Sequence, residues 1–132
     1  MVETVKDLSR ATVAQILIPV SDLEKAVPYY RDTLGIPFLF TAPPQMSFFQ
    51  CGNVRLLVGV HTEGEVAQRG SAIYFKVADI HAVHAQLAER GVQFAAEPHV
   101  VHQAATYDLW LAEFKDLDRN SLALMSEVPK TT

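Results

Sequence analysis

The chain has 132 residues, of which 49% are hydrophobic and 20% are charged, a composition typical of one globular domain. Its net charge of −4 and its scattered bases argue against nucleic acid as a partner, and no apolar run is long enough to span a membrane. The N-terminus lacks the apolar region of a signal peptide, and Cys51, the single cysteine, excludes an intrachain disulfide. We therefore expect a cytoplasmic protein.

The first half of the chain predicts one strand, one helix and three strands. Residues 14–20 are apolar and β-branched, as in a strand. Ser21 and Glu24 then form a capping box, which begins an amphipathic helix that Gly35 ends, and Pro28 predicts a kink within it. Pro-Pro and Gly-Asn turns separate the strands that follow, predicted at residues 37–41, 46–51 and 54–60.

The second half repeats this order after a polar linker at residues 61–70. Its expected elements are a strand at 72–77, a helix at 79–90, a short strand at 92–96, a loop at 97–105, and strands at 107–115 and 121–126. The predicted organisation is an N-terminal tail at residues 1–13, a first module at 14–60, a second module at 71–126 and a C-terminal tail at 127–132.

An internal repeat supports this division. Val20–Leu23 recurs as Val77–Ile80 at an offset of 57 (77 − 20), and Gly35 recurs as Gly91 at an offset of 56 (91 − 35). A duplication of this length predicts an α+β domain built from two tandem βαβββ modules.

Two stretches carry a family resemblance, the opening Val20–Gly35 and the closing Phe114–Leu124. They resemble the glyoxalase, bleomycin resistance protein and dioxygenase superfamily, also called vicinal oxygen chelate proteins. The closing stretch resembles the family's Phe-x-Asp-Pro-Asp-Gly-Asn turn, with Leu117 in place of Pro and Arg119 in place of Gly. The resemblance covers roughly residues 14–126. It implies a curved mixed sheet with a concave cavity, helices on the convex side, and a homodimer.

The resemblance also implies four metal-ligand positions, on the first and last strands of each module. In this chain they fall on Gln15, Leu56, Ala72 and Ala123. Only Gln15 has a ligating atom, so we expect no divalent metal and no other cofactor. His81 and His84 lie on the second helix, where solvated positions are expected. A substitute site from His99, His102 and Glu113 is the less favoured alternative to hydrogen-bonding loop histidines.

Strand alternation extends these positions to a mostly apolar cavity wall with a few polar groups. The expected ligand-binding residues are Gln15, Leu17, Leu56, Val58, Tyr74, Lys76, His102, Trp110, Glu113, Ser121, Ala123 and Met125. Trp110 and Phe114 share one face of their strand, and Leu111 and Glu113 share the other.

Two functions follow from this pattern. The preferred one is metal-free binding of a small apolar or aromatic molecule. The alternative is an enzyme related to the glyoxalase-type lyases, isomerases and epimerases or to the dioxygenases, acting through an unorthodox metal site or through metal-free acid–base residues. The candidate catalytic residues are Glu113, Tyr74 and Lys76. In both cases the partner is a small molecule, not a membrane.

Overall fold

A computed structural model describes residues 6–7, 9, 13–60 and 72–130 of the chain. The predicted linker at 61–70, nearly all of the N-terminal tail, and residues 131–132 lie outside the described residues. The elements of the first module are β1 (Gln15–Val20), α1 (Leu23–Pro28), η1 (Tyr29–Thr33), β2 (Phe38–Ala42), β3 (Met46–Cys51) and β4 (Val54–Val60). Those of the second are β5 (Ile73–Lys76), α2 (Ile80–Glu89), β6 (His99–Gln103), β7 (Tyr107–Lys115) and β8 (Ser121–Pro129).

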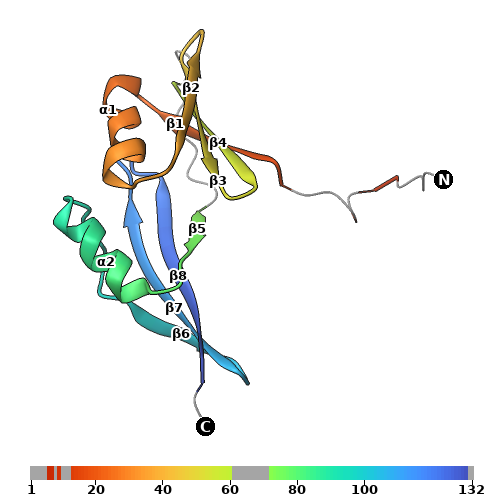
Figure 1. Cartoon of the computed structure of the whole chain (residues 1–132), viewed down its shortest axis with the longest axis vertical. Coiled ribbons are helices and arrows are strands. Elements are labelled where there is room, and N and C mark those ends of the chain that lie inside the picture. Colours follow the sequence, from red (N-terminus) through yellow and green to blue (C-terminus); the bar gives the residue numbers. More distant parts are fainter. Residues whose placement is uncertain (1–5, 8, 10–12, 61–71, 131–132) are drawn as a thin grey trace.

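Each module forms a four-stranded sheet with the same strand order. In the first sheet the order is β1-β4-β3-β2, and in the second it is β5-β8-β7-β6. In both, the first strand runs parallel to the last, and the other neighbours are antiparallel. The prediction of an α+β fold with two tandem βαβββ modules is confirmed, with the strands arranged as two separate sheets (Figure 1).

Both helices lie on one side of the molecule, the left in Figure 1, and each packs on the sheet of its own module. The core lies between these layers. Apolar side chains of the strands, such as Ile18, Val58 and Leu124, are buried there against Ala26 and Leu87 of the helices. This burial is the main stabilising contribution to each module, because apolar area removed from water is worth about 25 cal/mol per Å². Among the described helices, none is long and apolar enough to cross a membrane.

Aspartates cap both helices. The side chain of Asp22 accepts a hydrogen bond from the Glu24 amide, and Asp79 accepts one from the Ala82 amide. The predicted capping box is therefore displaced by one residue: Asp22, not Ser21, is the N-cap. The Ser21 amide instead donates to Asp118 of the second module.

A π-helical turn explains the irregular offset of the repeat. The α-helix of the first module ends at Pro28, and η1 continues it with wider i→i+5 turns, such as the bond from the Leu34 amide to the Tyr29 carbonyl. A π turn accommodates one residue more than an α-helix does. This extra residue reduces the offset from 57 at the helix N-caps to 56 at Gly35 and Gly91. The kink expected at Pro28 takes this form.

The second module departs from prediction at three places. The expected strand at 92–96 is reduced to a single bridge between Phe94 and Phe114. The expected loop at 97–105 contains β6, and the last strand continues to Pro129, into the predicted tail. The side chains of β6 are all exposed, so pairing with the β7 backbone, not burial, defines this strand. A hydrophobic pattern cannot reveal such a strand.

The two modules are joined through a buried carboxylate at the β7–β8 turn. Asp116 is 6% exposed, and its side chain accepts hydrogen bonds from the Tyr30 hydroxyl at 2.7 Å and from the amides of Asp118 and Asn120 at 2.9 and 2.8 Å. The side chain of Asn120 donates both to Asp116 and to the Pro19 carbonyl. Arg119 completes this turn with a φ of 68°, the conformation that the glycine of the family turn adopts without strain.

Candidate binding site on the open sheet faces

The face of each sheet opposite its helix is not covered by any described element; we call it the open face. In the first sheet, strand pairing brings an apolar row across it, formed by Leu17, Leu57, Phe48 and Phe40. Leu17 is 60% exposed and Phe40 is 46% exposed. The rings of Phe40 and Phe48 stack with centroids 4.7 Å apart. Such a contiguous exposed apolar row is typical of a binding surface.

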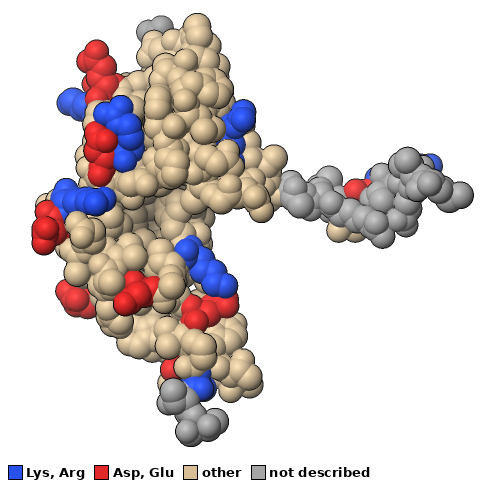
Figure 2. Space-filling model, in the orientation of Figure 1, with Lys and Arg blue, Asp and Glu red and all other residues tan. Residues whose placement is uncertain are grey.

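Polar groups border this row at the start of the strands. Gln15 of β1 is paired with Arg55 of β4, so both side chains lie on the open face. The Arg55 guanidinium lies over the Phe48 ring at 5.6 Å, a cation–π contact. In Figure 2 the charged side chains gather mainly along the edge that carries the helices, and much of the remaining surface is uncharged.

The open face of the second sheet contains a small pocket. Tyr74, Ala123 and Glu113 are neighbours across β5, β8 and β7, and they line a cavity of about 230 Å³ together with Ala72, Ala95 and Ser121. Ala123 is 1% exposed, whereas Tyr74 is 50% exposed. The pocket therefore has a small apolar floor, an aromatic wall and a carboxylate.

Several predicted wall residues lie where the alternation placed them. Gln15 and Leu17 are on the open face of the first sheet, and Tyr74, Lys76 and Met125 are on that of the second. The Lys76 ammonium lies 3.3 Å from the Glu127 carboxylate, and both side chains are well exposed, so this ion pair contributes little to stability. Lys76 thus has a protein partner, while Glu113 and Tyr74 face the pocket.

Three predicted wall residues lie on the opposite, helix-covered face. Leu56 and Val58 pair with Ile16 and Ile18, and both are buried, at 1% and 0% exposed. Their placement on the cavity side was wrong by one residue: Leu57 is the residue on the open face. Trp110 was also misplaced, since its ring packs edge-on against His81 of α2 at 4.9 Å.

Two histidines of β6 lie on the side of the open face. His99 pairs with Leu111 and His102 with Leu109, and a bulge at Val101 between them keeps both on one face. The ring of His99 bonds to the Glu97 carbonyl at 2.8 Å. His81 and His84 of α2 lie on the helix side, as expected, but their rings pack on Trp110 and Phe94, and His84 is half-buried where a solvated position was expected.

The positions of the family's metal ligands can now be read from the register. Val58 pairs with Ile18 and Leu124 pairs with Phe75, so the last strands correspond at an offset of 66 (124 − 58). Leu57 therefore matches Ala123 (123 − 57 = 66), and the four positions hold Gln15, Leu57, Ala72 and Ala123. Three of these side chains have no atom that can coordinate a metal. The part of the chain that the structure describes also contains no group of three His, Cys, Asp or Glu suited to a metal.

The open face contains residues that the sequence did not reveal: Phe40, Phe48, Arg55 and Leu57. In each of the adjacent pairs Phe48-Phe49 and Leu56-Leu57, one apolar side chain lies on either face of the sheet. The alternation of apolar and polar residues therefore cannot show which of the two lies on the open face. The exposed Arg55 was the available signal, because a charge on this strand must lie on the solvent side.

The fold is that of a duplicated βαβββ protein with one open, largely apolar face on each sheet. The family model for the Glyoxalase/Bleomycin resistance protein/Dioxygenase superfamily matches residues 12–124, and the chain belongs to this superfamily. It is 27% identical over 123 residues to the uncharacterized protein YraH of Bacillus subtilis, covering 83% of this chain and 94% of that protein.

Solved structures agree with this assignment. A superfamily member from Sphaerobacter thermophilus is 26% identical, with a TM-score of 0.74 over 89% of this chain and 98% of that one. The lactoylglutathione lyase from Agrobacterium tumefaciens is 17% identical, with a TM-score of 0.70 over 88% of this chain and 93% of that one. The latter similarity is one of fold.

Proposed function

We propose that the chain binds a small apolar or aromatic molecule on its open faces without a metal. The observation that carries this proposal is the row of Leu17, Leu57, Phe48 and Phe40, which presents apolar and aromatic surface to solvent. Arg55, Gln15, Tyr74 and Glu113 supply the few polar groups that orient a ligand in such sites. The aliphatic side chains of Leu57, Ala72 and Ala123 support binding without a metal ion.

The first readout is metal content. Purified without chelator or histidine tag, the protein is expected to hold less than about a tenth of an equivalent of any divalent ion by plasma mass spectrometry, since a functional metal site fills near stoichiometrically. About one equivalent per chain would overturn the metal-free part of the proposal. It would direct attention to His99, His102 and Glu113 as ligands.

The second readout is binding of a neutral fluorescent aromatic probe, 1-aminoanthracene. Leu17→Ala is expected to raise its Kd about fivefold, equivalent to about 1 kcal/mol of lost apolar contact. Leu117→Ala is the matched control, because Leu17 and Leu117 are 60% and 58% exposed and Leu117 lies in the β7–β8 turn. Equal effects of the two substitutions, or no binding by the wild type, would contradict a site on the open face.

Acid–base catalysis is the second candidate function. It is favoured by one observation: Glu113 and Tyr74 flank Ala123 in the same pocket, so a carboxylate and a phenol face the same bound molecule. Recovery of each bound ligand unchanged after long incubation supports simple binding. Conversion of a ligand to a product by the wild type, together with loss of this conversion in Glu113→Gln, supports an enzyme.

We also propose that a second copy of the chain closes the open face. Leu17, Tyr74 and Phe40 are 60%, 50% and 46% exposed, and neighbouring apolar side chains exposed in this way are typical of protein–protein contacts. Light scattering is expected to give a molar mass near twice the 14.6 kDa of one chain. Leu17→Arg should shift this mass toward the monomer, because it places a charge in the covered surface. A monomeric wild type would reject the dimer but not the binding site.

A further inference from the structure

A second cavity lies on the opposite side of the sheets, between the two modules. Its volume is about 310 Å³, at the lower end of the range for small-molecule sites. It is lined on one side by Leu34, Ile36 and Cys51 of the first module and on the other by Phe75, Val83, Leu87 and Phe114 of the second. Of these side chains only Phe114 also lines the pocket of the open face.

The internal repeat identifies what occupies the equivalent place in the other half of the molecule. With the offset of 57 set by the helix N-caps, Leu87 corresponds to Tyr30 (87 − 30). Phe114 pairs with Leu122 as Phe49 pairs with Leu56, so β7 corresponds to β3 at an offset of 65 (114 − 49). At this offset Cys51 corresponds to Asp116 (116 − 51).

The buried contact between Tyr30 and Asp116 therefore has the pair Leu87 and Cys51 as its counterpart. In the first case a phenol ring fills the space between a helix of one module and a hairpin turn of the other, with its hydroxyl on the carboxylate. Tyr30 is 1% exposed there. In the second case leucine replaces tyrosine and a thiol replaces the carboxylate, and the cavity lies at this place.

The lining determines which molecules fit. Apolar side chains dominate it. The polar side chains near it already have partners: the Gln50 side-chain nitrogen donates to the Gly52 carbonyl at 2.7 Å, and the Lys76 ammonium pairs with Glu127. A charged ligand would lose its hydration without a counter-charge. Apolar cavities on the order of 150 Å³ already accept benzene-sized molecules. The volume thus suits an uncharged molecule with one or two rings.

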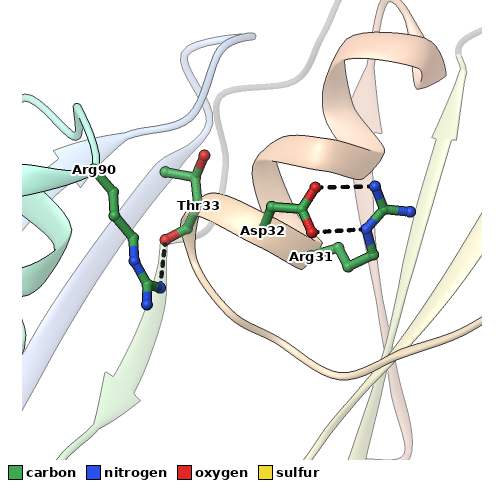
Figure 3. A network of polar contacts seen from close by, with 4 residues as sticks. All are labelled: Arg31, Asp32, Thr33 and Arg90. Carbon is green, nitrogen blue, oxygen red and sulfur yellow. Dashed lines mark hydrogen bonds and ion pairs between the residues drawn. The ribbon is translucent and has the colours of Figure 1, made fainter.

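Arg90 links the two modules close to this cavity. Its guanidinium donates to the Thr33 carbonyl at 3.2 Å, linking the end of α2 to the end of η1 beside Leu34 and Gly35 (Figure 3). The neighbouring Arg31 side chain forms an ion pair with Asp32 and points away from Arg90. The Arg90 guanidinium therefore already has an acceptor in the protein, and it is not part of the cavity lining.

We propose that this cavity between the modules is a second binding site, for an uncharged phenol-sized aromatic molecule that occupies the place corresponding to the Tyr30 ring. Apart from Phe114, its apolar lining is distinct from that of the open-face pocket, so this proposal does not depend on the function proposed above.

Cys51 allows a direct test, because it is the only cysteine of the chain and it lines the cavity. Burial raises the pKa of its thiol, so its alkylation by iodoacetamide is slow and sensitive to access. With p-cresol at millimolar concentration, the alkylation rate is expected to fall at least fivefold. The anion 4-methylbenzoate, with a similar ring and methyl group, is expected to leave the rate within twofold.

Variants connect this protection to the cavity. Leu87→Tyr and the smaller change Val83→Leu fill the space, so both should remove at least most of the effect of p-cresol. Ala85→Leu, at an exposed position of the same helix, and Tyr74→Ala, on the open face, should retain it. Absence of protection by p-cresol in the wild type would overturn the site. Equal protection by 4-methylbenzoate would overturn the proposed class of ligand, and loss of protection in Tyr74→Ala would assign it to the open face.

Discussion

Replacing Asp116 with alanine is expected to lower the free energy of unfolding by about 4 kcal/mol, the scale of a broken buried polar network. The substitution removes the acceptor of four hydrogen bonds, which come from the Tyr30 hydroxyl, the Asp118 amide, and the amide and side chain of Asn120. Each buried donor left without a partner costs about 1–3 kcal/mol. Water that enters the space left by the side chain recovers part of this cost. Urea unfolding followed by circular dichroism measures the change.

Asp32→Ala is the control for this experiment, because it removes a carboxylate that is exposed to solvent and, among the described residues, pairs only with Arg31. Its unfolding midpoint should match that of the wild type within error. A double-mutant cycle with Tyr30→Phe should give a coupling energy of about 1–2 kcal/mol between Tyr30 and Asp116. A loss below about 1 kcal/mol in Asp116→Ala would show that this turn does not hold the modules together.

The stability of the protein is also expected to fall steeply above pH 10. Burial, and secondly the charge of Asp116, raise the pKa of Tyr30 well above its ordinary value of 10. The folded chain then keeps a phenol proton that the unfolded chain has already released. This stabilisation is complete below about pH 10 and is lost as the pH rises above it, by up to about 1.4 kcal/mol per pH unit.

Tyr29 adds to this dependence, since burial followed by the charge of Asp116 raises its pKa to about 12. Its ring is partly exposed, so the contribution of Tyr30 is the larger. Comparing wild type with Tyr30→Phe isolates that contribution: the variant should be less stable near neutral pH and should lose less stability between about pH 9 and about pH 11. Parallel curves over this range would mean that Tyr30 ionises without opposing the fold.

The repeat made most of the fold predictable. Both copies contain a first strand, a helix and three further strands, but the second copy has β6 in place of the strand expected at 92–96. The failures have local causes. The edge strand β6 buries no side chain, so no apolar pattern marks it. An error of one residue, Leu56 in place of Leu57, put the predicted wall residues of β4 on the wrong face of the sheet.

The candidate sites were predictable to different degrees. Gln15, Leu17 and Tyr74 followed from alternation anchored on the family positions, whereas alternation left open whether the face of Glu113 or that of Trp110 lines the pocket. Trp110 could not be assigned a side without knowing that His81 packs on it. The cavity beside Cys51 depends on a contact between modules that are far apart in the sequence, and no periodicity describes that contact.

The separation of the sheets has a mechanical consequence. Within the described chain, no strand of β1–β4 pairs with a strand of β5–β8, so no ladder of backbone hydrogen bonds fixes the angle between the two halves. The polar links between them end at helix termini and turns, as at Asp116 with Tyr30 and at Arg90 with Thr33. One buried hydrophobic cluster also contains residues of both halves. The angle between the two open faces is therefore set by side-chain packing and by these few polar links, and not by backbone pairing.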